Sequence, residues 1–168
     1  MPQHRLVLVR HAEAANGPDD VNRPLTDRGA QHAAAIGAWL DKAGSVPDRV
    51  LVSPARRARQ TWELAGARLL PGRQPIVDER IYDNTVEALL EAIRETPEDV
   101  RTLAVVGHNP SVGALAGVLD DGQGSPAARG EIGAGFRTGA AAVFVLETPF
   151  TAIGPDSATL SDFAVPGD

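Results

Sequence analysis

The chain has 168 residues, of which 43% are hydrophobic and 23% are charged, and its formal net charge at pH 7 is −6. This is the composition of an ordinary folded protein, and we expect residues 1–168 to form a single domain. The acidic balance argues against binding to nucleic acid or to a membrane surface. The lack of cysteine excludes disulfides, thiolate metal sites and cysteine nucleophiles. With neither a membrane-length apolar run nor a signal-peptide pattern, we expect a cytoplasmic protein.

The first half of the chain alternates short apolar runs with amphipathic stretches. Residues 5–9 (RLVLV) predict a buried strand, and the polar stretch 12–24 predicts a loop. Thr26 is a typical helix cap, so we expect a helix from there to about residue 43, with Gly44 as its stop. Further elements are expected as a strand over 50–52, a helix over 56–69 closed by Pro71 and Gly72, and a short strand over 76–77.

The second half continues this alternation. Asn84, followed three residues later by Glu87, resembles a capping box and predicts the start of a helix. Residues 120–139 are rich in glycine and are expected to be irregular. The other expected elements are a strand over 103–106, a helix over 111–119, a strand over 140–146 and a last strand over 159–165. This order predicts a three-layer α/β/α sandwich with a mainly parallel central sheet and one antiparallel edge strand.

Polar clusters follow three of the expected strands. Arg10 and His11 come after the first strand, Arg56 and Arg57 lie just beyond the second, and His108 follows the strand over 103–106. Right-handed crossovers place the carboxyl ends of parallel strands on one edge, where open α/β sheets bind their ligands. We therefore expect these side chains to converge.

Arginine and histidine together suit the transfer of a phosphoryl group. The guanidinium presents a planar fork of donors to phosphate oxygens, and neutral histidine is available near pH 7 as a nucleophile. The chain has neither a P-loop motif nor a G-x-S-x-G motif, and no metal-binding cluster is evident. These residues therefore predict a mechanism without metal or cofactor, in which one histidine attacks phosphorus and the other charged groups hold the oxygens.

Five motifs, in the family's order, resemble those of the histidine phosphatase (phosphoglycerate-mutase-like) superfamily. They are LVRHAE at 8–13, PLTDRG at 24–29, SPARRARQT at 53–61, ERIY at 79–82 and VGHNP at 106–110. The resemblance implies that His11 becomes phosphorylated and that Arg10, Arg57 and His108 bind the phosphoryl group. It places the second pocket arginine at Arg57 rather than at its neighbour. Ala12 stands where the family usually has glycine, and its methyl group could crowd the turn.

Other polar residues have less certain places in this scheme. The resemblance makes Glu79 the first candidate for the proton donor to the leaving group, with Asp83 and Glu13 as alternatives. Asn16 and Arg23, in the loop after His11, are candidates for substrate binding, although ordinary loop polarity explains them almost as well. The two remaining histidines, His4 and His32, are expected in solvent, at the terminus and on a helix surface.

The short chain is most similar to the small SixA-type phosphohistidine phosphatases, because little room is left for lid insertions between the helix of Arg57 and Glu79. The resemblance therefore implies a phosphatase that acts on phosphohistidine in another protein. A phosphatase of a small phosphomonoester, such as a sugar phosphate or nucleotide, is the first alternative. A noncatalytic phosphate-binding scaffold is the second.

Overall fold

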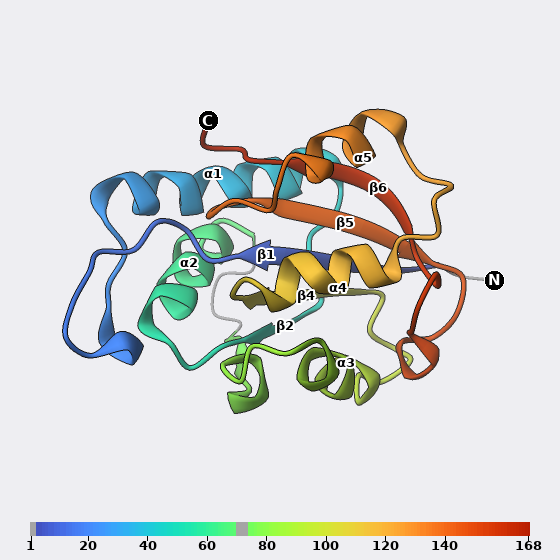
Figure 1. Ribbon diagram of the computed structural model, residues 1–168, viewed down its shortest axis with the longest axis horizontal. Coiled ribbons are helices and arrows are strands. Elements are labelled where there is room, and N and C mark those ends of the chain that lie inside the picture. Colours follow the sequence, from blue (N-terminus) through green and yellow to red (C-terminus); the bar gives the residue numbers. More distant parts are fainter. Residues whose placement is uncertain (1–2, 70–73) are drawn as a thin grey trace.

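The structure, a computed structural model, describes residues 3–69 and 74–168. Within these residues six strands form one sheet in the order β3-β2-β4-β1-β5-β6 (Figure 1). The parallel part contains β1 (His4–Arg10), β2 (Arg49–Val52), β3 (Ile76–Val77) and β4 (Thr102–Gly107). The antiparallel part contains β5 (Ala141–Leu146), which pairs with β1, and β6 (Thr159–Ala164) at the edge.

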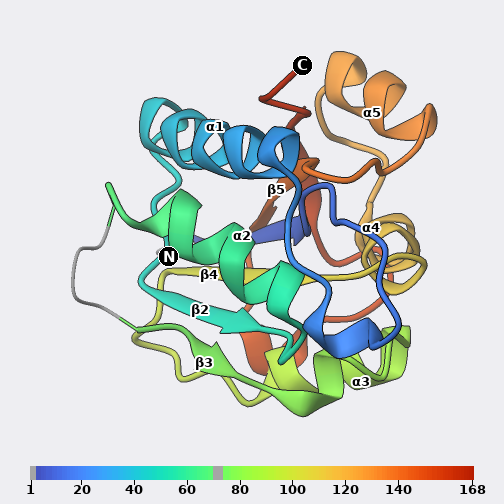
Figure 2. The same ribbon diagram turned by 90° about the vertical axis from the view of Figure 1, so that its left-hand side faces the viewer.

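Helices cover both faces of this sheet (Figure 2). One face carries α1 (Asp27–Ala43) and α2 (Arg56–Gly66), and the other carries α3 (Val86–Arg94) and α4 (Ser111–Leu119). α5 (Pro126–Gly133) packs against β6, and the short 3-10 helices are η1 (Asp20–Asn22), η2 (Glu79–Ile81) and η3 (Phe150–Ala152). The predicted three-layer α/β/α sandwich is confirmed. Across the described part of the chain, no helix has the length and apolar character needed to cross a bilayer.

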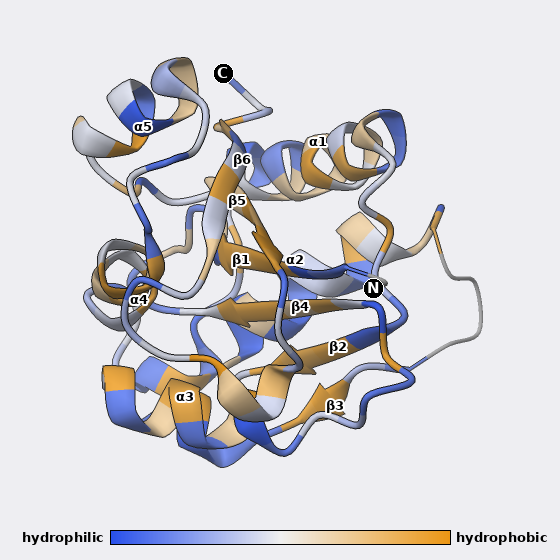
Figure 3. Cartoon of the chain, turned by 90° about the vertical axis from the view of Figure 1, so that its right-hand side faces the viewer, coloured by the Kyte–Doolittle hydropathy of each residue, from blue (hydrophilic) through white to orange (hydrophobic). Residues whose placement is uncertain are grey.

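The position of β1 inside the sheet explains why its sequence is apolar without a break. Leu6 and Leu8 face the core formed with α3 and α4, whereas Val7 and Val9 face the core formed with α1 and α2. All four side chains are fully buried. A strand covered on both faces needs apolar residues at successive positions, as the hydrophobic colouring of the central strands shows (Figure 3).

The helix α1 begins and ends as predicted. The Thr26 side chain caps it by accepting a hydrogen bond of 3.0 Å from the Gly29 backbone N–H, and Gly44 ends it with a left-handed φ of 69°. Gly29 also lets the helix contact the loop after β1, since a Cβ at this position would lie 2.0 Å from the backbone oxygen of Glu13. The PLTDRG motif is therefore a packing motif that fixes the loop after β1.

Three elements expected from the sequence need correction. Asn84 does not cap α3, because its backbone is left-handed, with φ of 63°, and Thr85 caps the helix by accepting from the Ala88 N–H. Residues 126–133 form α5 although they lie in a glycine-rich stretch expected to be irregular. α5 has a Ser125 cap and Pro126 at its start, which are ordinary helix-start signals. α2 ends at Gly66, earlier than expected, while Pro71 and Gly72 lie outside the described residues.

The two histidines expected in solvent are buried. His4 lies inside the sheet rather than before it, with Nδ1 3.0 Å from the Val100 carbonyl oxygen and its ring edge-on to Phe150. His32 is 9% exposed, because the face of α1 that carries it is covered by Gly139 and the C-terminal segment at Gly167. Both are explained by packing.

The contact between Gly29 and Glu13 predicts a stability difference between two glycine substitutions. Gly29→Ala forces backbone apart and should lower the free energy of unfolding by about 1–3 kcal/mol. Gly117→Ala, in a helix where the added Cβ meets no atom within 4 Å, should raise it by about 0.4–1 kcal/mol. Urea unfolding of both variants measures the difference, and equal effects would contradict the packing described for Gly29.

Candidate active site

The ends of three parallel strands lie level with one another. Arg10 of β1 pairs with Gly107 of β4, and Val52 of β2 pairs with Val106 of β4. One more backbone hydrogen bond continues each pairing beyond the strand end. The His11 N–H donates to the Gly107 oxygen at 3.0 Å, and the Ser53 N–H donates to the Val106 oxygen at 3.2 Å. This register brings the polar residues after all three strands to one edge of the sheet.

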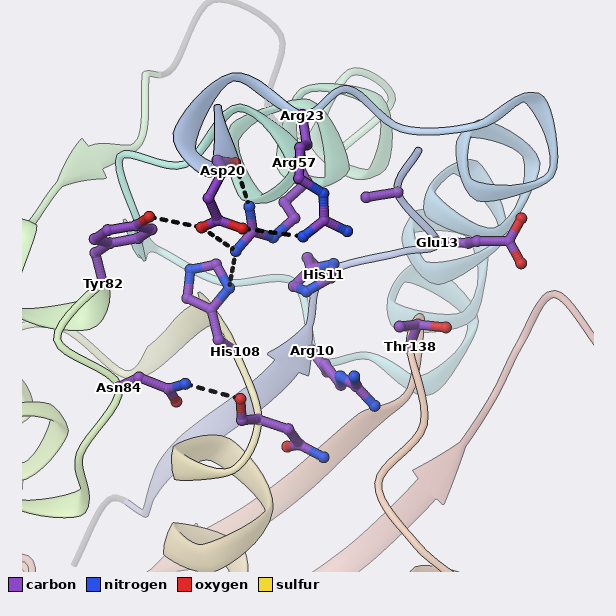
Figure 4. Close-up of a pocket in the computed structure, with 12 residues that line it drawn as sticks. Arg10, His11, Glu13, Asp20, Arg23, Arg57, Tyr82, Asn84, His108 and Thr138 are labelled. Carbon is purple, nitrogen blue, oxygen red and sulfur yellow. Dashed lines mark hydrogen bonds and ion pairs between the residues drawn. The ribbon is translucent and has the colours of Figure 1, made fainter. Parts of the chain in front are cut away.

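A cavity of about 530 Å³ opens at this edge. Figure 4 shows side chains from several loops and strand ends arranged around it. Its lining consists of Arg10, His11, Glu13, Ala14, Asp20, Arg23, Arg57, Tyr82, Asn84, His108, Asn109 and Thr138. The four residues predicted as the phosphoryl pocket, Arg10, His11, Arg57 and His108, therefore lie together, and Arg23 joins them.

His11 is held with one ring nitrogen directed at its own backbone. Nδ1 lies 2.8 Å from the Ala12 carbonyl oxygen, and because a carbonyl can only accept, the proton is assigned to Nδ1 and the lone pair to Nε2. Burial lowers the pKa of His11 to about 4, and the charges of Arg57 and Arg10 also lower it against the hydrogen bond to Ala12. His11 is thus neutral near pH 7 and has a free nucleophilic nitrogen.

His108 lies beside His11, with ring centroids 5.2 Å apart. Its Nε2 is 2.7 Å from the Ser53 hydroxyl, and its Nδ1 is 3.5 Å from Nη2 of Arg57. Since arginine only donates, Nδ1 is assigned as the acceptor and Nε2–H as the donor to Ser53. Burial lowers the pKa of His108 to about 3, with the proximity of His11 and Arg57 adding to the effect. Ser53, the first residue of the SPARRARQT motif, therefore orients this ring.

Arg57 is the arginine of its run that faces the cavity. It lies in the first turn of α2 and is 7% exposed, whereas its neighbour Arg56 is exposed to solvent. A helix N-terminus favours anions through its free backbone N–H groups. The placement that the resemblance gave to Arg57 therefore agrees with the geometry.

Arg10 has a donor without a partner. Its Nη1 donates to the Phe136 carbonyl oxygen at 3.1 Å, but its buried Nε has no hydrogen-bond acceptor, alone among the buried side-chain polar atoms of the described residues. Leaving such a donor unpaired is unfavourable by about 1–3 kcal/mol.

The turn that carries His11 is tied to the helix that carries Arg57. The fully buried Thr61 hydroxyl accepts from the Ala12 N–H at 3.0 Å and donates to the Arg57 carbonyl oxygen at 2.7 Å. Ala12 is fully buried and is not among the left-handed residues of the described chain, so alanine fits where the family usually has glycine. On the other side of the turn, the Gly139 N–H donates to the carbonyl oxygens of Arg10 and His11.

Several lining residues were not among the predicted site residues. The Asp20 carboxylate contacts Arg23, Arg57 and Tyr82, as described below, and Asn84 links the loop before α3 to the turn after His108. Thr138 enters from the loop before β5. Tyr82, the last residue of the ERIY motif, also lines the cavity, and its ring lies edge-on to His108 with centroids 5.7 Å apart. The sequence signal that could have identified Asp20 as a site residue is its position, three residues before the candidate Arg23.

Three of the remaining candidates lie outside the cavity. Glu79 and Asp83 are exposed and do not line the cavity, and neither does Asn16. Glu13 lines the cavity, but its Oε1 accepts a hydrogen bond of 2.8 Å from the Thr26 hydroxyl and its carboxylate points away from His11 (Figure 4). The structure therefore does not bring Glu79 to the reacting groups.

Comparison with known proteins identifies the class to which this fold and site belong. Residues 6–102 match the histidine phosphatase superfamily (branch 1), and the chain belongs to this family. It is 34% identical over 131 residues to the phosphohistidine phosphatase SixA of Escherichia coli, a match that covers 73% of this chain and 78% of SixA.

Two solved structures resemble the whole chain. SixA from Nakamurella multipartitia superimposes with a TM-score of 0.87 at 29% identity, covering 99% of this chain and 98% of the other. The protein histidine phosphatase SixA complexed with tungstate gives a TM-score of 0.78 at 28% identity, covering 96% and 97% of the two chains. The SixA-like character expected from the short chain is confirmed.

The buried imidazoles predict a dependence of stability on pH. In the unfolded chain the imidazoles of His11 and His108 protonate near pH 6.5, whereas folded His11 stays neutral down to about pH 4. The unfolded state therefore takes up protons that the folded state does not, and the free energy of unfolding should decrease as pH falls from about 6.5 towards 4. NMR titration of the ring carbons measures the folded value, and a His11 titration near 6.5 would contradict it.

Proposed function

We propose that this protein is a phosphatase that removes the phosphoryl group from phosphohistidine in another protein, through a phosphohistidine intermediate on His11. The observation that carries the proposal is the state of His11. It is neutral, its Nδ1 is fixed by the Ala12 carbonyl, and its Nε2 is free in a cavity lined by Arg10 and Arg57. A nucleophile of this kind beside arginines suits phosphoryl transfer.

The reaction has two displacement steps at phosphorus. In the first, Nε2 of His11 forms a bond to phosphorus while the bond from phosphorus to the leaving nitrogen breaks. Arg10 and Arg57 hold the negative charge spread over the equatorial oxygens. His108, whose Nε2–H donates to Ser53 in the empty cavity, would donate to an oxygen from Nδ1 only in its protonated form. In the second, water attacks the phosphoryl group on His11, which releases inorganic phosphate and restores the free imidazole.

The carboxylates of the cavity favour a leaving group that departs without a strong acid. Of the described residues, Glu13 and Asp20 are the carboxylates in the lining. Hydrogen bonds from Tyr82, Arg23 and Arg57 hold the pKa of Asp20 far below its usual range, so it has no proton to give. The Glu13 carboxylate is turned towards Thr26. A substrate imidazole protonates near pH 6.5 and leaves readily as a neutral ring, unlike an alkoxide.

Similarity to SixA supports the same substrate class, and the rim of the cavity is compatible with a protein substrate. The Asp20 side chain is 52% exposed and Tyr82 is 37% exposed, so the rim of the cavity is open to solvent. A phosphorylated side chain of another protein can approach such a site without a deep channel.

Replacement of the nucleophile tests the proposed reaction. His11→Ala should abolish the release of phosphate from a phosphohistidine protein, and Arg10→Ala or Arg57→Ala should reduce kcat/KM on the order of 10²-fold or more. A chelator should leave the wild-type rate unchanged. Retained activity in a folded His11→Ala variant would sink the assignment. Faster turnover of sugar phosphates or nucleotides than of phosphohistidine would point to a metabolite phosphatase.

The positions of the carboxylates predict how the rate depends on the leaving group. Without a positioned acid, kcat/KM for aryl phosphates should fall steeply as the pKa of the leaving phenol rises, and alkyl phosphates should be poor substrates. Glu79→Gln should have the wild-type profile across this series, since its side chain is outside the cavity. A loss on Glu79→Gln confined to substrates with basic leaving groups would instead identify Glu79 as the acid.

A further inference from the structure

Both terminal nitrogens of Arg57 are already occupied by a single residue of the loop after β1. Nη1 donates to the backbone oxygen of Asp20 at 2.8 Å, and Nη2 donates to the Asp20 carboxylate oxygen Oδ2 at 3.2 Å. These are the two nitrogens that a guanidinium uses when it binds a phosphoryl group end-on. The most buried arginine of the cavity is therefore bound to an anion that belongs to the protein itself.

Two further donors converge on the same carboxylate, one from the same loop and one from the segment that precedes α3. Arg23 donates from Nη1 to Oδ1 of Asp20 at 3.0 Å, and the Tyr82 hydroxyl donates to Oδ2 at 2.6 Å (Figure 4). Together with Nη2 of Arg57, these form three convergent donors around one anionic group. Hydrogen bonding to Asp20 also raises the pKa of Tyr82, so its hydroxyl keeps the proton that it donates. This arrangement is the one that an oxyanion ligand would meet.

We propose that Asp20 is an internal ligand of the cavity, and that an incoming phosphoryl group binds by displacing its carboxylate from Arg57 and Arg23. Asp20 thereby lowers the affinity of the site for substrate and for product phosphate. The inference deepens the proposed function, since it concerns the same cavity, but it requires only that the cavity binds a tetrahedral oxyanion.

The contacts of the neighbouring backbone show how the exchange can occur with little movement. The bond from Arg57 Nη1 to the Asp20 backbone oxygen and the bond of 2.9 Å from Arg23 Nε to the Ala15 oxygen do not involve the carboxylate. Rotation of the Asp20 side chain alone would free Nη2 of Arg57, Nη1 of Arg23 and the Tyr82 hydroxyl. The arginines would stay oriented by their backbone contacts, and the half-exposed carboxylate can turn into solvent.

The difference in charge favours this exchange. A phosphoryl dianion brings more negative charge and more acceptor oxygens to the arginines than a carboxylate does. In the empty cavity, the carboxylate offsets the repulsion between the charges of Arg23 and Arg57.

Binding of tungstate, a tetrahedral dianion, to the whole protein tests the proposal by calorimetry without any turnover. Asp20→Asn removes the charge but keeps the shape, and should lower the Kd for tungstate roughly three- to tenfold. Asp20→Ala removes the competing group altogether and should lower the Kd at least as much. The matched control is Asp19→Asn, which removes the same charge one residue away, outside the lining of the cavity, and should bind like the wild type.

Two results would overturn the proposal. Weaker or unchanged binding by both folded Asp20 variants would overturn the proposal, and weaker binding would show that Asp20 positions the arginines instead. An equal gain in Asp19→Asn would assign the effect to net charge and would also overturn it. Because the measurement needs no hydrolysis, tighter binding by the Asp20 variants would support the proposal even if phosphohistidine were not the substrate.

Discussion

The register of β1 against β4 is the constraint on which the site depends. Pairing of Arg10 with Gly107 sets the ends of two parallel strands level, and the bond from the His11 N–H to the Gly107 oxygen extends that register by one residue. A shift by one position would turn Arg10 and His11 to the opposite faces of the sheet. Gly107 itself has little room for a side chain, since a Cβ there would lie 2.9 Å from Ile81. The buried core on both faces of β1 therefore also fixes where the reactive imidazole stands.

The electrostatics of the cavity follow from that placement. Burial and the neighbouring guanidinium charges keep His11 neutral. In the proposed reaction the same arginines hold the phosphoryl oxygens. Concentrated positive charge in an empty cavity is unfavourable, and the Asp20 carboxylate offsets it at Arg57 and Arg23. The arginine charges and the Asp20 carboxylate therefore act on three properties of the cavity together. These are the protonation state of His11, the lack of a proton on Asp20, and the affinity for an anion.

Much of the fold could be predicted from local pattern. The apolar run of β1, the Thr26 cap and Gly44 stop of α1, and the strand-to-helix turn at His108 are all set by neighbouring residues. The helix α5 was missed because glycine content outweighed the Ser125 and Pro126 start signals. The only lining residues of the cavity that could be predicted with their roles are those that follow strands, because the ends of parallel strands have a fixed place in the fold. Asp20 and Tyr82 reach it from loops, whose path depends on packing that no local pattern encodes, and the exposed position of Glu79 depends on the same kind of loop geometry.

The proposed reaction requires the transfer of a phosphoryl group to one ring nitrogen, Nε2 of His11. Rapid quenching of the protein during turnover of a phosphohistidine protein, followed by peptide mapping under alkaline conditions, locates that group by mass spectrometry. We predict a phosphorylated peptide that contains His11, modified on its imidazole, with none on the peptide of His108. Phosphate release without any such intermediate, or a phosphoryl group on His108 instead, would contradict the assignment of His11 as the nucleophile.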